Sequence, residues 1–236
     1  AGSIAYFNKS LVRLPYGISE VNYRIPRSEN PRYQTNRYLL PLTDEALRSI
    51  DIDQMELKVK ETTQTVQFTL TLGKTVETKT YNKDTSGQII NLEEDFHSNI
   101  EMGIFPRMLS KNESENNYFK VMIITRDNDE NDHFRPSDVK LRFYRKNGLG
   151  CEVVEETSRE ANYGVLPPVI RSRQGKDGNS CSTKFYELFN SGAPAAISMM
   201  FQVDGKCFEG VLLPQMQYQK SIDNNFIYAV DLGTSY

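Results

Sequence analysis

The chain has 236 residues, a net charge of −3 at pH 7 and a hydrophobic fraction of 38%, and its mean hydropathy is −0.55. A chain of this length buries roughly 70% of its unfolded surface, so we expect one large domain or two small ones. The acidic balance does not favour a general nucleic-acid binder, and no apolar run approaches the ~20 residues of a membrane helix, so no membrane partner is expected.

Residues 1–42 are expected to form an irregular N-terminal arm, because proline recurs along them and disfavours helix. Five arginines are interleaved with four tyrosines in this arm: Arg13, Arg24, Arg27, Arg32 and Arg37 among Tyr16, Tyr23, Tyr33 and Tyr38. Such a pattern can bind single-stranded nucleic acid by stacking and phosphate contacts. It is more typical of an arm that packs its tyrosines on the body and leaves its arginines in water.

Residues 43–50 are the best candidate for a helix. Thr43 can cap the first turn, which is acidic. Ala46, Leu47 and Ile50 fall on one face of the helix, and that face would pack on the rest of the protein. A helix this short would not be stable without such packing.

Most of the remaining chain has the apolar period of strands. Residues 66–72 and 139–144 alternate apolar and polar side chains, which indicates strands with one buried face. Asn147-Gly148 follows the second of these stretches and tolerates the positive φ of a tight hairpin turn. A second hairpin of the same kind is expected within residues 195–213.

The sequence therefore predicts a mainly-β fold, either one β-sandwich or two small β modules, with one short helix near residues 43–50. The expected organisation is an arm at 1–42, a β-sandwich module at 43–160 and a second module or a continuation of the first at 161–225. Residues 226–236 are expected to begin another, truncated domain.

Three cysteines, Cys151, Cys181 and Cys207, lack the close spacing of metal ligands. Their odd number favours reduced, buried thiols in a cytoplasmic protein. One disulfide with a spare thiol is the alternative. Neither His97 nor His133 lies in a metal-binding motif, so both are expected to be surface or structural residues.

An acidic stretch between two expected strands has the partial spacing of a calcium loop. Asp127, Asp129, Asn131 and Asp138 fall at its first, third, fifth and twelfth positions, and oxygen ligands suit calcium. The sixth position, which should be glycine, is Asp132, and the twelfth should be a bidentate glutamate. The sequence favours a solvated loop over a metal site here.

The most informative stretch is the last one. Residues 226–230 form an apolar run typical of a buried strand. Directly after it come Asp231, Leu232, Gly233, Thr234 and Ser235. This stretch resembles the first phosphate motif of the ATPase superfamily that contains actin, the heat-shock chaperone ATPases and the sugar kinases.

The resemblance implies a role for each matching residue. Asp231 would lie near the hydrated Mg²⁺, Gly233 would let backbone N–H groups approach the phosphates, and Thr234 and Ser235 would donate to phosphate oxygens. The resemblance covers about ten residues. The second phosphate motif, the adenosine motif and the catalytic groups would lie beyond Tyr236, so the chain alone is expected neither to bind nor to hydrolyse ATP.

We therefore expect a non-catalytic N-terminal accessory domain of a longer, truncated actin- or chaperone-like ATPase. ATP and Mg²⁺ would be cofactors of the parent protein and not of this chain. Its partner would be another protein or its own downstream ATPase domain. The alternative is a free-standing β-sandwich that binds a glycan or a protein. No catalytic residue is expected in either case.

Overall fold

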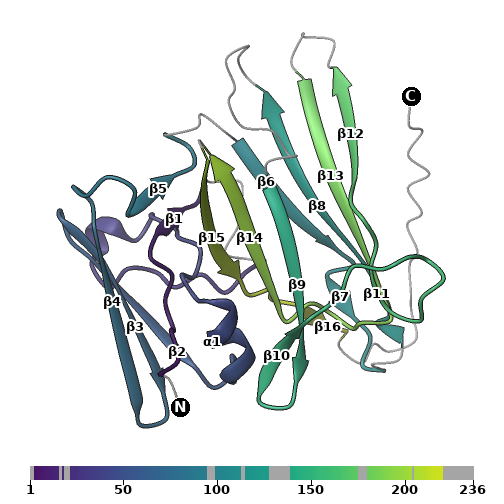
Figure 1. Ribbon diagram of the computed structural model, residues 1–236, viewed down its shortest axis with the longest axis horizontal. Coiled ribbons are helices and arrows are strands. Elements are labelled where there is room, and N and C mark those ends of the chain that lie inside the picture. Colours follow the sequence, from purple (N-terminus) through teal and green to yellow (C-terminus); the bar gives the residue numbers. More distant parts are fainter. Residues whose placement is uncertain are drawn as a thin grey trace.

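The computed structural model describes residues 3–15, 18, 22–94, 99–112, 115–127, 139–174, 180–203 and 205–219. In these ranges the chain is mainly β, with one short α-helix, α1 (Asp44–Ser49), and one 3-10 turn, η1 (Pro31–Tyr33) (Figure 1). The predicted mainly-β class with a short helix is confirmed.

Two antiparallel sheets form the larger part of the molecule. The four-stranded sheet has the order β10 (Gly150–Val153), β9 (Val139–Asn147), β14 (Ala196–Val203) and β15 (Lys206–Leu212). The five-stranded sheet has the order β11 (Gly164–Val165), β13 (Ser180–Phe189), β8 (Tyr118–Asp127) and β6 (Asn99–Phe105), and β12 (Val169–Gln174) also pairs with β13.

These two sheets pack face to face as a β-sandwich. Apolar residues at alternate positions point into one shared core, as the period-two pattern predicts. That core contains Val121 and Ile123 from β8, Leu188 from β13, Phe143 from β9 and Phe201 from β14, all nearly or fully buried.

A third sheet, with the order β2 (Glu56–Glu61), β3 (Thr65–Leu72) and β4 (Thr75–Asn82), lies beyond the four-stranded sheet (Figure 1). It contributes Val66, Phe68 and Tyr81 to a second core. Consecutive residues of the four-stranded sheet point into different cores: Phe143 into the first and Tyr144 into the second. The middle sheet is therefore buried on both faces.

The sequence left open whether residues 161–225 form a second module or continue the first. β13 pairs with β8 over ten residues, from Ser180↔Asp127 to Phe189↔Tyr118. β14 pairs with β9 from Ala196↔Tyr144 to Phe201↔Val139. Both halves of the chain therefore contribute strands to the same two sheets.

Helix α1 is set by the residues that predicted it. The Thr43 side chain accepts a hydrogen bond from Ala46 N at 3.0 Å, and Ala46 and Leu47 are fully buried. The helix ends against β10, where a Cβ on Gly150 would lie 2.1 Å from Arg48 O. Glycine is needed at this position because the helix backbone occupies the space of any side chain.

The N-terminal arm contributes to both cores, with Leu39 in the first and Leu40 in the second. Its backbone pairs with the outer edge of β15, where Leu40 and Val211 exchange N–H···O bonds of 2.9 and 2.8 Å. Tyr23 and Tyr38 are buried. These tyrosines pack on the body, as the sequence favoured.

Short strands complete the arm and the ends of the sandwich. β1 (Leu11–Arg13) pairs in parallel with β5 (Ile89–Asn91), and β7 (Met108–Leu109) pairs in parallel with β16 (Gln217–Tyr218). No helix in the described part of the chain is long and apolar enough to cross a membrane.

Two of the cysteines are described as free thiols. Cys151 is buried, and burial raises the pKa of its thiol. Cys207 is exposed, so the expectation of buried thiols is wrong at this position. It lies at the start of β15, where Lys206 is exposed as well. The side chain of Cys181 lies outside the described residues.

Candidate binding cleft

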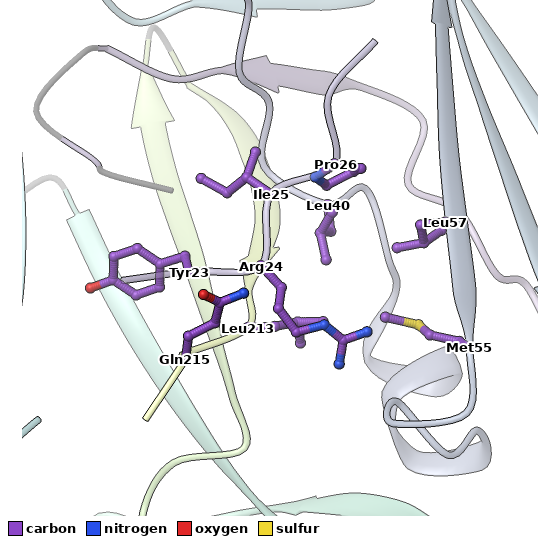
Figure 2. Close-up of a pocket in the computed structure, with 9 residues that line it drawn as sticks. All are labelled: Tyr23, Arg24, Ile25, Pro26, Leu40, Met55, Leu57, Leu213 and Gln215. Atoms are coloured by element: carbon purple, nitrogen blue, oxygen red, sulfur yellow. The ribbon is translucent and has the colours of Figure 1, made fainter. Parts of the chain in front are cut away.

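Two neighbouring hollows lie where the arm, the turn before β2 and the end of β15 meet. The smaller has a volume of about 320 Å³ and is lined by Tyr23, Arg24, Ile25, Pro26, Leu40, Met55, Leu57, Leu213 and Gln215 (Figure 2). The larger has a volume of about 810 Å³ and reaches from Asp53 to Tyr218. Arg24 and Leu213 line both hollows, so the two are adjacent and together form the candidate site.

The floor of the site is an arm segment laid against the chain after β15. Arg24 N donates to Leu213 O at 2.8 Å, and Gln215 N donates to Asn22 O at 2.8 Å. Tyr23, between them, is fully buried and directs its hydroxyl to Met102 O at 3.3 Å. Burial raises the pKa of Tyr23 well above its usual value, so the ring and its neutral hydroxyl anchor the floor.

Arg24 extends from this floor toward the α1–β2 connection. Figure 2 shows its guanidinium beside Met55. Arg24 Nη1 donates to Ile52 O at 3.1 Å and lies 3.9 Å from Asp53 Oδ1. Lys146, from the end of β9, forms an ion pair with the same Asp53. Asp53 thus links the arm to the sandwich.

The β9–β10 hairpin forms the opposite wall. Asn147-Gly148 makes the predicted turn, and Gly148 has the positive φ of 63° that the turn requires. Arg145 and Glu152 face each other in the ladder and form an ion pair, and Asn147 Nδ2 donates to Glu152 Oε2 at 2.6 Å. These side chains present fixed polar groups to the cleft.

Aromatic side chains flank the polar wall. Tyr218, on β16, lines the larger hollow and is 63% exposed. Tyr163 lies under the Arg145 guanidinium, 4.8 Å from ring centroid to Cζ. An exposed ring beside charged and amide groups can stack against an apolar patch of a ligand while the polar groups bind its hydroxyls or amides.

The charges of the cleft are largely matched to one another. Asp53 has two cationic partners, Arg24 and Lys146. Glu152 has Arg145 and the amide of Asn147. A ligand therefore meets a surface of paired charges that favours hydrogen bonding over a strong net attraction for one sign.

A third hollow of about 240 Å³ lies between β9 and β13 and contains a buried lysine. Lys184 Nζ donates to Val139 O at 2.7 Å and lies 5.5 Å from the Tyr186 ring centroid. The Tyr186 hydroxyl in turn accepts from Leu141 N at 3.2 Å. These groups already bind one another across the sandwich, so we interpret this hollow as structural.

The residues singled out from the sequence fall mostly outside the described part. Asp231, Gly233, Thr234 and Ser235 lie outside it, and so do Asp129, Asn131 and Asp138. Asp127 ends strand β8, but its side chain is not described. Across the residues that are described, no group of three or more His, Cys, Asp or Glu could hold a metal ion.

The sequence did not predict that the cleft residues form a site, although it named Tyr23 and Arg24 in the arm and Asn147 in the turn. A local signal exists for one pair, because the Asn147-Gly148 turn places Arg145 opposite Glu152 in the ladder. No sequence signal brings Arg24 to Asp53, or places Tyr218 in the same hollow as the hairpin, since these segments lie far apart in the chain. No family model matches the sequence, and no curated protein matches it significantly.

Proposed function

We propose that this chain is a non-catalytic recognition domain that binds part of a protein partner in the cleft between the arm and the β9–β10 hairpin. The observation that carries the proposal is the 810 Å³ hollow, which combines the exposed Tyr218 with paired charges from three separate segments. Hollows of this size with a few convergent polar groups suit ligand binding.

The paired carboxylates support recognition over catalysis. Asp53 and Glu152 each contact a cation at close range, which holds their side chains in place. A carboxylate held in this way orients a neighbouring arginine or lysine so that it can donate to backbone carbonyls of a bound peptide.

The experiment is a binding screen of the chain against peptide and glycan arrays, repeated with the variant Tyr218→Ala. Tyr118→Ala is the matched control, because Tyr118 is also an exposed tyrosine, at 43%, and does not line the cleft. We expect peptides whose binding is lost in Tyr218→Ala and kept in Tyr118→Ala. Equal retention in both variants would place binding elsewhere on the surface.

The alternative is a free-standing β-sandwich that binds a glycan. It is favoured by Tyr218, because an exposed ring in a hollow that Asn116, Asn147 and Glu152 also line is suited to stacking on a sugar while polar groups bind its hydroxyls. Glycans retained in the array, with the same dependence on Tyr218, would favour this reading over the peptide one.

We further propose that the domain serves a longer actin- or chaperone-like ATPase in partner recognition or regulation. The support is the apolar run of residues 226–230 and the Asp231-Leu232-Gly233-Thr234-Ser235 motif that follows it in the sequence. The chain alone is expected to show no thermal shift with Mg-ATP. A coding sequence that continues into a second Asp-x-Gly motif supports the proposal, whereas a stop codon after Tyr236 contradicts it.

A cytoplasmic location belongs to the same proposal. The free thiols of Cys151 and Cys207 support it, because unpaired cysteines persist in reducing compartments. Fractionation of cells that express the full-length protein tests this, and recovery in a secreted or membrane fraction contradicts it.

A further inference from the structure

The open edge of β12 is the feature that the cleft does not use. In the part of the chain that the structure describes, β12 pairs only with β13, so its other edge carries no neighbouring strand. The first five residues of β12 are all exposed, and they include Val169 at 55% and Ile170 at 46%. None of the residues that line the cleft belongs to β12.

Two other sheet edges are covered by the N-terminal arm, and a third carries mixed charge. The arm covers β2 through a bridge between Ser28 and Val59, and it covers β15 at Val211. β4 is also an edge strand, and its eight residues include three threonines, one glutamate and one lysine. Edge strands pair readily with further strands, and natural proteins usually protect them, so an open edge such as that of β12 is a candidate docking surface.

The chemistry of β12 selects for an acidic neighbour. Arg171 and Arg173 stand at alternate positions, so both lie on the outer face of the sheet, in register with Thr183 and Cys181 of β13. Arg171 and Lys120 each stack on the ring of Phe185, with 5.6 and 4.6 Å from the cation to the centroid. Two arginines of β12 therefore lie on this face beside an apolar start of the strand, and Lys120 reaches the same face from β8.

The same charges disfavour a second copy of this chain. If two β12 strands paired around their arginines, Arg171 and Arg173 of one copy would lie opposite or diagonal to those of the other. Like charges at these positions destabilise strand pairing. An incoming strand with Asp or Glu at alternate positions would instead form cross-strand ion pairs while its apolar residues cover Val169 and Ile170.

We propose that the β12 edge takes up an extended acidic segment of a partner protein as an additional strand. The six residues of β12 offer ~20 Å of edge, enough for a segment of about six residues. Backbone hydrogen bonds along the edge provide affinity, and the arginines provide selectivity for acidic side chains. This surface is independent of the cleft, so the two proposals can fail separately.

The probe is a fluorescein-labelled peptide of eight residues that alternates valine with glutamate, and its counterpart alternates valine with lysine. Fluorescence anisotropy with the full chain at low salt is expected to detect binding of the acidic peptide only. Added salt should weaken it, because exposed charges are screened. Equal binding of both peptides, or binding of neither, overturns the proposal.

Two variants locate the site. The double substitution Arg171→Glu and Arg173→Glu is expected to lower the affinity roughly tenfold or more, since it turns attraction into repulsion at two positions. Lys58→Glu with Lys60→Glu is the matched control, because β2 is an edge strand that the arm already covers. Loss of affinity in the control, or none in the β12 variant, contradicts the site.

Backbone pairing is tested by modifying the peptide. The protein stays unchanged, so no variant can fail to fold. Successive N–H groups of a strand point to opposite sides. N-methylation of one set of alternate residues should therefore abolish binding, and methylation of the other set should leave it. Equal effects of the two sets would exclude strand addition. Light scattering tests whether a second copy of this chain occupies the edge instead. A concentration-dependent dimer that the β12 variant disrupts would show this and contradict the proposal.

Discussion

The buried carboxylate of Glu61 joins the N-terminal arm to the three-stranded sheet. Its Oε1 atom accepts hydrogen bonds from Asn36 Nδ2 and the Tyr38 hydroxyl, each at 2.9 Å, and lies 2.7 Å from Lys83 Nζ. Glu61 is 1% exposed, so water does not reach this position to accept hydrogen bonds in place of the carboxylate. The substitution Glu61→Ala is therefore expected to leave the Tyr38 hydroxyl buried without an acceptor.

The expected loss of stability in Glu61→Ala follows from these contacts. Removing one partner from a buried ion pair costs about 3–5 kcal/mol. Two features favour the low end: Lys83 keeps 26% of its side chain exposed, and Glu61 Oε2 has no hydrogen-bond partner among the described residues, so desolvation already opposes the pair. We expect a loss of about 3 kcal/mol, which lowers the Tm by roughly 6–12 °C in a chain of this size.

Urea unfolding at pH 7 measures the change in the free energy of unfolding. The control is Glu56→Ala, an exposed glutamate on the same strand whose contact with Lys58 is at the surface, and it should change stability by less than about 0.5 kcal/mol. A double-mutant cycle with Lys83→Met isolates the ion pair. A loss below about 1 kcal/mol in Glu61→Ala would refute the buried network as a clamp on the arm.

Two further predictions concern α1 and β15. Burial tends to raise the pKa of Asp44, but hydrogen bonds from Arg48 and Tyr144 outweigh this and hold the pKa below its usual 3.8. A lowered folded-state pKa stabilises the protein above the unfolded pKa, so the stability difference between wild type and Asp44→Asn, present at pH 6, should shrink as the pH falls below about 4. Gly210→Ala should destabilise by about 1–3 kcal/mol, since its Cβ would lie 2.4 Å from Leu39 Cβ in the closely packed arm.

Each of these has its own check by urea unfolding. For Asp44→Asn, a stability difference that grows as the pH falls from 6 to 3 would contradict the sign. For Gly210→Ala, the control is Gly103→Ala on β6, where the nearest atom to the new Cβ would be Met122 Cε at 3.8 Å. Equal losses in the two glycine variants would show that strand propensity, and not the contact with Leu39, sets the cost.

Local patterns determined the elements of this fold. The alternation of residues 66–72 predicted β3, and the apolar face of residues 43–50 predicted α1 with Thr43 as its cap. Asn147-Gly148 predicted the β9–β10 turn. These features depend on residues within a few positions of one another, so the period and the turn chemistry are sufficient to find them.

The tertiary structure decided how these elements are combined and where the sites lie. Tyr144 reads as a wet-face residue in the sequence, yet it is buried because a second core covers the far side of β9. Glu61 is a charged residue on β2, and the arm that folds over this strand buries it. Arg24 and Asp53 meet because the arm returns beside the chain after β15. Such contacts join distant segments, and a single sequence carries periodicity but no record of which faces will meet.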